Sequence, residues 1–303
     1  MSVDLFCYGE IGVDNIIQLP HLPSPELAAF PTGDTYHIGG AAANTAVWLA
    51  KLGIDTALSG NWIGNDLYGR QLWQWLNQHP QIDLSLVGRG EEETTPFCRA
   101  MVTPDGERTF LVYGYPQARK SELTLQHLAG VTYLALDLYG GEERQRAAEV
   151  AAKAGVQTAV GDVIETDHPI LPLAPIVTNS AAYMREALPG VDVHRQTCRL
   201  QAVNGGIVVA TDGAHELIAV GLNGQAYRVQ PPAVTAVDAT GAGDAFRAGL
   251  LAALLKGESL PRALCWGVAA GALKVQHLGA ATTLPSAEEI VALADTLDAL
   301  SSH

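Results

Sequence analysis

Short apolar runs alternate along the chain with longer amphipathic or apolar stretches, and glycine, proline and asparagine separate them. The opening run, residues 3–9, predicts a buried strand, and Ala41–Leu52 predicts a helix that stops at Gly53. Further strands are predicted at residues 57–63, 131–138, 157–160, 176–179 and 207–211, and further helices at residues 66–78, 142–154, 245–255, 260–275 and 286–300. This alternation predicts an α/β fold with a doubly wound, mostly parallel sheet flanked by helices.

Two segments depart from this alternation. Residues 95–113 alternate apolar and polar side chains around the turn Pro104-Asp105-Gly106, which is typical of a β-hairpin. Residues 16–25 predict a short exposed strand and a loop, and residues 35–38 predict a second short strand. We therefore expect a small antiparallel β-sheet lid from residues 15–38 and 95–118, and a large α/β domain from residues 1–14, 39–94 and 119–303.

Composition and charge narrow the classes of partner. The net charge of −14 disfavours nucleic acid, because duplex binding needs clustered lysine and arginine. The four cysteines form no Cys-x-x-Cys pair and the nine histidines show no zinc-binding spacing, so we expect free thiols and no zinc site built by the protein. No apolar run reaches the length of a membrane span, and the expected location is the cytoplasm.

Residues 238–246 carry the strongest chemical signal and read Asp-Ala-Thr-Gly-Ala-Gly-Asp-Ala-Phe. Gly241, Ala242 and Gly243 lead into the predicted helix 245–255, and small residues at a helix start expose backbone N–H groups that bind anions. Asp244 places a carboxylate beside that anion. This pairing suits phosphoryl transfer to a hydroxyl, which needs charge stabilisation and a proton acceptor. From these residues alone, an ordinary helix start with an acidic first turn is the alternative.

The same stretch resembles the C-terminal signature of the PfkB (ribokinase-like) carbohydrate kinase family, Asp-Thr-x-Gly-Ala-Gly-Asp-x-Phe, from which only Ala239 departs. The run Gly39-Gly40-Ala41-Ala42-Ala43-Asn44-Thr45-Ala46 resembles the second signature of that family, and residues 64–69 are similar to its Gly-x-Asp-x-x-Gly motif. The resemblance extends from residue 9 to about residue 285, and two ordered signatures make it specific. It implies a ribokinase-like fold and a kinase that uses ATP and Mg²⁺.

The resemblance also implies roles on the side of the phosphoryl acceptor. Asp244 matches the catalytic base that deprotonates the sugar hydroxyl, and residues 241–243 match the anion hole. A carboxylate and a carboxamide can bind vicinal hydroxyls, and paired glycines let a ligand approach the backbone. A turn residue at Asp14, a helix cap at Asn44 and a turn former at Asp137 are the alternatives. The matching sugar contacts are Asp14, Gly39, Gly40, Asn44 and Asp137.

On the nucleotide side, the matching positions are Asn179, Thr211, Gly213 and Gly267. Thr211 and Gly213 form the Thr-x-Gly of the nucleotide pocket, and Asn179 begins an Asn-x-x-Glu motif that is broken because Ala182 replaces its glutamate. That glutamate helps to arrange magnesium and phosphates in relatives. The positions that resemble the surroundings of a potassium ion in many relatives, with an ordinary turn as the alternative, are Asp238, Thr240, Gly279 and Thr283.

We therefore expect an ATP-dependent sugar kinase whose partners are a small sugar and ATP. A nucleoside kinase of the same family is one alternative. A non-catalytic ligand-binding relative is another, suggested by Ala182 and by Glu216 at a usual glycine position, and opposed by the intact Asp244. A dinucleotide-dependent oxidoreductase is disfavoured because Gly241-x-Gly243 lacks the third glycine of that motif. The exposed edge of the predicted hairpin is consistent with a homodimer formed through the lid.

Overall fold

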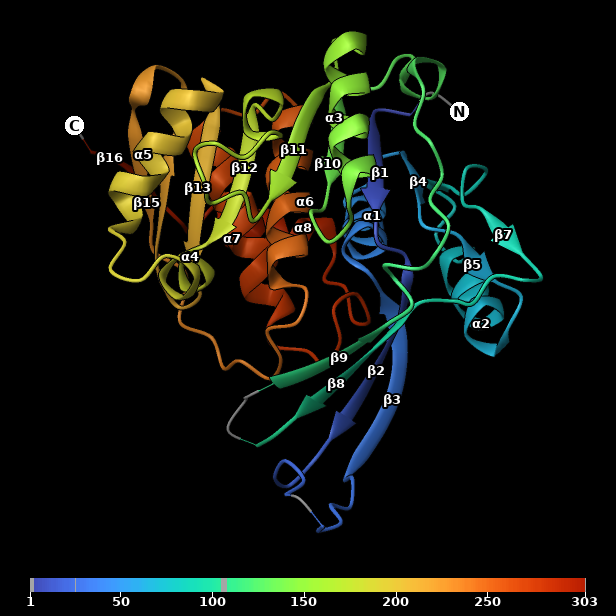
Figure 1. Cartoon of the computed structure of the whole chain (residues 1–303). Helices are drawn as coiled ribbons and strands as arrows, with labels where there is room; N and C mark the ends of the chain where they lie inside the picture. The colour runs from blue at the N-terminus through green and yellow to red at the C-terminus, as the bar shows by residue number, and fades with distance from the viewer. Residues whose placement is uncertain (1–2, 25, 105–107, 303) are drawn as a thin grey trace.

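A ten-stranded sheet forms the centre of the larger unit in the computed structural model, which describes residues 3–24, 26–104 and 108–302 (Figure 1). Seven neighbouring strands, from β13 to β6, are parallel, and β14, β15 and β16 extend the sheet with antiparallel pairing. In sheet order the strands are β16 (Ala299–Ser302), β15 (Ala226–Val229), β14 (His215–Val220), β13 (Ile207–Asp212), β12 (Ile176–Ser180), β11 (Gln157–Gly161), β10 (Tyr133–Leu136), β1 (Leu5–Gly9), β4 (Thr56–Gly60) and β6 (Ile82–Asp83).

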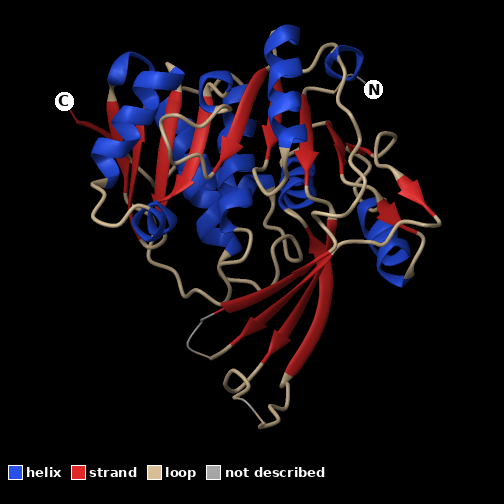
Figure 2. Ribbon diagram, viewed as in Figure 1, coloured by secondary structure: helices blue, strands red, loops and turns tan. Residues whose placement is uncertain are grey.

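Helices cover both faces of this sheet (Figure 2). Alternate residues of β1 separate the two cores: Leu5 and Cys7 pack with one helical layer, and Phe6 and Tyr8 pack with the other. Because both faces of β1 are buried, its sequence is continuously apolar. The first layer contains α1 (Ala41–Lys51), α6 (Ala242–Leu255), α7 (Leu260–Lys274) and α8 (Ala287–Ala294), and the second contains α3 (Glu142–Ala154), α4 (Ala181–Ala187) and α5 (Val193–Asn204). These layers confirm the predicted doubly wound fold.

The strand order reverses beside β1. From β1 the chain moves outward to β4 and β6, and then crosses to β10 on the other side of β1 before continuing to β11, β12 and β13. The carboxyl ends of parallel strands lie at one edge of a sheet, and such a reversal leaves a crevice there. The segments that follow β10, β11 and β12 meet the start of α6 at this edge.

A four-stranded sheet projects from the same edge, below the large sheet in Figure 1. In order, its strands are β3 (Gly33–Gly39), β2 (Gly12–Gln18), β8 (Phe97–Val102) and β9 (Arg108–Tyr113). The β3–β2 and β8–β9 pairs are antiparallel, whereas β2 and β8 are parallel. We predicted an exposed strand from residue 16, but β2 begins at Gly12 and is buried through Ile16, because it lies between two other strands. Asp105 and Gly106 of the predicted turn lie outside the described residues.

A short two-stranded sheet and one further helix complete the region between the two sheets. Its strands are β5 (Ile63–Gly64) and β7 (Arg89–Gly90), and α2 spans Leu67–Leu76. Asp66 caps α2 by accepting a hydrogen bond from the Gly69 amide at 2.8 Å. The predicted strand 57–63 is interrupted at Asn61, whose side chain bonds to the backbone of Ile11.

The last predicted helix is wrong in its second half. Helix α8 ends at Ala294, and residues 299–302 instead form β16 on the edge of the large sheet. The unpaired edge of β15 offers backbone hydrogen bonds to this segment, and it therefore forms a strand. The helical spacing of apolar residues does not reveal such a tertiary contact. Within the described residues, no helix has both the length and the apolar character that a membrane crossing requires.

Close packing of α6 against α7 depends on Gly249. A Cβ atom at this position would lie 2.7 Å from the carbonyl oxygen of Trp266, so the two backbones must move apart to accept it. We expect Gly249→Ala to lower the free energy of unfolding by about 1–3 kcal/mol. Gly271→Ala is the matched control, because the nearest atom that its Cβ would meet beyond its own turn of helix is the Ala242 carbonyl oxygen, at 3.5 Å. Chemical denaturation should show that control to be neutral or stabilised by about 0.5–1 kcal/mol, and equal losses in both variants would contradict the packing argument.

Candidate active site

The start of α6 forms an anion cradle. Gly241 is the N-cap and has a φ of 75°, a conformation that favours glycine, and a Cβ there would lie 2.5 Å from the side chain of Ala280. The Ala242 amide donates to the carbonyl of Ala239, whereas first-turn amides such as those of Gly243 and Asp244 have no intrahelical acceptor. A Cβ on Gly243 would meet no described atom within 4 Å. Two amides and the positive end of the helix dipole therefore face open space.

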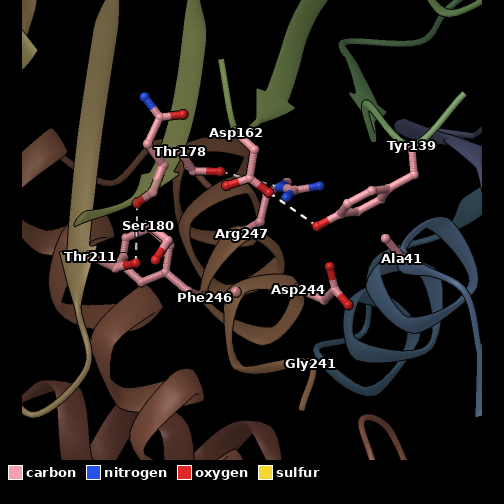
Figure 3. A pocket seen from close by; sticks show the side chains of 12 residues that line it. Ala41, Tyr139, Asp162, Thr178, Ser180, Thr211, Gly241, Asp244, Phe246 and Arg247 are labelled. Carbon is pink, nitrogen blue, oxygen red and sulfur yellow. Dashed lines mark hydrogen bonds between the residues drawn. The ribbon is translucent and has the colours of Figure 1, made fainter. Parts of the chain in front are cut away.

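Asp244 points into this space from the first turn of α6 (Figure 3). Burial raises the pKa of its carboxyl to about 6, and the charges of Asp137 and Asp162 act in the same direction. The charge of Arg247 and a hydrogen bond from Asn44 oppose this rise. A carboxyl with a pKa near 6 is ionised at neutral pH and can still accept a proton, as a general base must.

Asn44 connects Asp244 to the N-terminal part of the chain. It lies in α1 and is buried, and its Nδ2 donates to Asp244 Oδ2 at 3.3 Å. Its Oδ1 is also buried and has no hydrogen-bond partner among the described residues. Buried polar atoms are normally paired, so this oxygen is available to a donor on a ligand.

Asp14, Gly39 and Gly40 complete the acceptor side. Asp14 lies in β2, and burial raises its pKa to about 7, with a contribution from the charge of Asp244. A Cβ on Gly39 would collide with the Asp14 carboxyl, so this glycine makes room for the acid. Gly40, the N-cap of α1, has a φ of 89°, and a Cβ there would collide with the carbonyl of Glu10. The structure thus brings four of the five predicted contacts of this side to one end of α1.

On the other side of Asp244 lies a cavity of about 210 Å³ that is open to solvent. Asn179 and Thr211, two of the positions predicted to contact a nucleotide, line it. Asn179 Nδ2 donates to the Val163 carbonyl at 2.7 Å, its buried Oδ1 has no partner among the described residues, and Thr211 Oγ1 donates to the Asn179 carbonyl at 3.2 Å. The lining residues are Ala41, Tyr139, Asp162, Thr178, Asn179, Ser180, Thr211, Gly241, Gly243, Asp244, Phe246 and Arg247.

Five polar residues that line this cavity are absent from the sequence prediction: Tyr139, Asp162, Thr178, Ser180 and Arg247. Arg247 is one helical turn after Asp244 in α6, and its Nε donates to Thr178 Oγ1 at 3.3 Å. Asp162 follows β11 with a φ of 60°, and Tyr139 follows β10 and donates to Asp162 Oδ2 at 3.2 Å. In the sequence, Arg247 is a charged residue within an otherwise apolar run, three positions after Asp244, and this spacing could have indicated that it lies beside the base. Asp162 and Tyr139 follow strand ends without a recognisable motif.

One predicted sugar contact, Asp137, and two predicted nucleotide contacts, Gly213 and Gly267, do not line the cavity. Asp137 is buried and pairs with the equally buried Arg144, at 2.9 Å between Oδ1 and Nε, and its Oδ2 accepts from the Glu10 amide at 2.5 Å. Gly213 has a φ of 59° and forms the turn between β13 and β14. Gly267 lies in α7, where a Cβ would be 2.7 Å from the ring of Phe246, so its contact is with α6.

Two of the departures from the family motifs, Ala182 and Glu216, lie near the cavity and in the large sheet. Ala182 is exposed in the first turn of α4, just beyond the cavity residue Ser180. Glu216 lies in β14 and pairs with Arg228 of β15 at 2.7 Å. The Glu216 carboxylate is therefore engaged within the sheet.

Of the four positions predicted to surround a potassium ion, hydrogen bonds join three, and the fourth is exposed. Asp238 Oδ1 accepts from the Thr240 amide at 2.8 Å, and its Oδ2 accepts from the Gly279 amide at 2.9 Å. Thr283 is exposed. A residue absent from the prediction, Lys274, lies beside Asp238, and burial lowers its pKa to about 8 while the charge of Asp238 opposes the change. Lys274 is therefore charged at neutral pH.

Comparison with known proteins identifies a family and similar chains. A family model described as pfkB family carbohydrate kinase matches residues 3–287. A ribokinase of Haemophilus influenzae is 29% identical over 307 residues, covering 95% of this chain and 97% of the relative, and a nucleoside kinase of Methanocaldococcus jannaschii is 26% identical over 301 residues, covering 94% of each. The structure of Arabidopsis thaliana ribokinase complexed with ribose and ATP superimposes with a TM-score of 0.83 at 20% identity, covering 97% of this chain and 99% of that one.

Because Asn44 stabilises the ionised form of Asp244, its removal should raise the pKa of that carboxyl further above its value of about 6. We expect Asn44→Ala to show this shift in a carboxyl carbon NMR titration of the unliganded protein. Asn204→Ala is a control, because the Asn204 side chain bonds to the Ala174 carbonyl away from the cavity. An unchanged or lower pKa of Asp244 in Asn44→Ala would contradict the described contact.

Proposed function

Because the chain belongs to the pfkB family of carbohydrate kinases, and is thus a phosphotransferase that acts on an alcohol group, we propose that it transfers the γ-phosphoryl group of ATP to a hydroxyl of a small sugar or sugar derivative. One observation carries the proposal. Asp244 lies at the amide-rich start of α6, between the unpaired oxygen of Asn44 and the cavity that contains Asn179. A base between an acceptor site and an anion cradle is the arrangement that phosphoryl transfer requires.

In the proposed reaction, Asp244 accepts the proton of the acceptor hydroxyl. The oxygen of that hydroxyl attacks the γ-phosphorus in line. The amides of Gly243 and Asp244, which have no acceptor within the helix, stabilise the charge on the transferred group, and the α6 dipole adds to their effect. The bond from the γ-phosphorus to the bridging oxygen breaks, and ADP leaves. Positioning and charge stabilisation supply most of the rate, because the protein forms no covalent intermediate in this step.

The acceptor is proposed to bind beside α1. The unpaired Oδ1 of Asn44 can accept from one hydroxyl and the buried carboxyl of Asp14 can bind another, while Gly39 and Gly40 leave the backbone accessible. Asp137 remains a predicted contact, although both of its oxygens already accept hydrogen bonds from the protein. Polar groups fixed in this way can discriminate between acceptors by their hydroxyl positions.

ATP is proposed to occupy the cavity with its phosphates toward α6. Asn179, Thr211 and the guanidinium of Arg247 line this space, and Gly213 and Gly267 remain predicted contacts of the nucleotide. The described residues contain no group of three or more metal-ligating side chains, which suits Mg²⁺, since this ion is usually held by one or two carboxylates together with phosphates and water. Asp162 and the unpaired Oδ1 of Asn179 would hold it. When bound, Mg²⁺ neutralises phosphate charge.

The four-stranded sheet is proposed to act as the lid over the acceptor and as the surface through which two copies pair. Arg108 of β9 donates to Thr240 Oγ1 at 3.5 Å, which connects the tip of this sheet to the cradle loop. Exposed apolar side chains on β3 and β9 support pairing, because such a surface is rarely left in water. They are Tyr36, Phe110, Leu111, Val112 and Tyr113.

A nucleoside kinase is the second candidate, supported by the similarity to the nucleoside kinase of M. jannaschii. The same base and cradle would serve a riboside hydroxyl. A non-catalytic ligand-binding role is opposed by the retained Asp244, because ligand binding alone does not need a general base at this position.

Replacing Asp244 by Asn removes the proton acceptor with little change in shape. We expect kcat to fall by about 10²–10⁴, the usual contribution of a positioned base, while ATP binding and the melting temperature change little. Release of ADP in the presence of acceptor measures the rate. Asp55→Asn, an exposed carboxylate in the loop before β4, is the matched control. Undiminished turnover in Asp244→Asn would exclude this residue as the base.

The rate should also depend on pH. Asp244 works as a base only when ionised, and its pKa is raised to about 6, so kcat at saturating ATP and acceptor should fall as pH drops through about 6. Arg247→Met should move the midpoint upward, because the positive charge of Arg247 lowers the pKa of Asp244. A pH–rate profile of the two proteins tests this. A flat profile between about pH 5 and pH 7 would contradict the assignment.

A further inference from the structure

Lys274 is a buried lysine at the C-terminal end of α7, with an exposed fraction of 1%. Its Nζ donates to the carbonyl of Asp238 at 2.6 Å and to the carbonyl of His277 at 3.1 Å, and lies 3.8 Å from Asp238 Oδ2. Three oxygens thus face the three N–H donors of one ammonium group. A buried cation needs such compensation, because it has lost its hydration shell.

The segment that Lys274 contacts leads directly to the anion cradle. The carboxylate of Asp238 accepts from the amides of Thr240 and Gly279, and the amides of Val237 and Asp238 both donate to the carbonyl of Val275. These bonds fasten loop 237–240 to the end of α7, immediately before Gly241. Lys274 supplies the positive charge of this junction from beneath the loop.

The family resemblance implies a potassium ion at this junction, but the residues present do not fit one. Potassium binds in proteins to carbonyl and carboxylate oxygens. Here the carbonyl and a carboxylate oxygen of Asp238 already face the Lys274 ammonium, whose charge would repel a second cation at short range. Thr283, the fourth position of the expected set, is exposed.

We propose that the ammonium of Lys274 is a built-in monovalent cation that positions loop 238–241, and that this enzyme therefore transfers phosphoryl groups without added potassium. The claim about phosphoryl transfer without potassium rests on the proposed kinase function, whereas the claim that Lys274 positions loop 238–241 does not. Lys274 is a positioning residue: it contacts Asp238 and His277, and it acts on the cradle through the loop rather than on the reactants.

Two substitutions at this position separate charge from volume. Lys274→Ala removes the charge and leaves space beside the Asp238 carbonyl, whereas Lys274→Met removes the charge and keeps most of the volume. Lys153→Met, an exposed lysine of α3, is the control. Melting temperature and kinase rate are measured for all four proteins in potassium chloride and in choline chloride at equal ionic strength.

The wild type and Lys153→Met should give the same melting temperature and the same rate in both salts. In choline, both Lys274 variants should melt lower, on the order of 5–10 °C, because Asp238 loses its buried partner. Their rates should fall on the order of 10–100-fold, as a displaced cradle predicts. Potassium should restore both quantities in Lys274→Ala, which has room for the ion, and not in Lys274→Met.

Two results would overturn the proposal. One is a wild-type protein whose melting temperature or rate rises in potassium relative to choline. The other is a Lys274→Met variant that matches the wild type in choline. If neither Lys274 variant folds, the comparison of the wild-type protein in potassium and in choline still tests the proposal. If none of the four proteins phosphorylates an acceptor, the proposed function fails, and the melting temperatures still test the role of Lys274.

Discussion

The site depends on holding the charge of Asp244 in a partly buried place at the start of α6. Burial disfavours that charge, as its raised pKa shows, and three features oppose the penalty: the positive end of the helix dipole, the amide of Asn44 and the guanidinium of Arg247. The same positive field would attract the phosphates of a nucleotide. The base and the anion cradle therefore have one physical origin, which explains why they occupy the same helical turn.

Distant parts of the chain must converge for this turn to work. Asp14 and Asn44 come from the N-terminal part, while Asp244 and Lys274 come from the last quarter of the chain. The reversal of strand order beside β1 brings these segments to one edge of the sheet. Further bonds lock them in place: Trp48 Nε1 in α1 donates to the Ala280 carbonyl at 3.0 Å, and Lys274 joins the loop before Gly241 to the end of α7.

Much of this could be predicted from the sequence, because its signals are local. The alternation of strands and helices gave the sheet and its two helical layers, and the small residues before Asp244 indicated the cradle. The remaining features depend on tertiary contacts. Strand β16 forms only because β15 offers an open edge, Asp137 is engaged by Arg144, and Gly267 faces α6 rather than the cavity. Asp162 and Lys274 belong to no motif, and only the fold brings them to the site.

The most direct test of the central claim is to detect the phosphorylated product itself. The wild-type protein would be incubated with ATP and Mg²⁺ and a panel of hexoses, pentoses, sugar acids, sugar phosphates and nucleosides, and each reaction examined by mass spectrometry and phosphorus NMR. The account predicts that at least one acceptor gains a phosphate ester in an amount equal to the ADP formed. Binding of acceptors and ATP, seen as a rise in melting temperature, with no ester from any acceptor would contradict it.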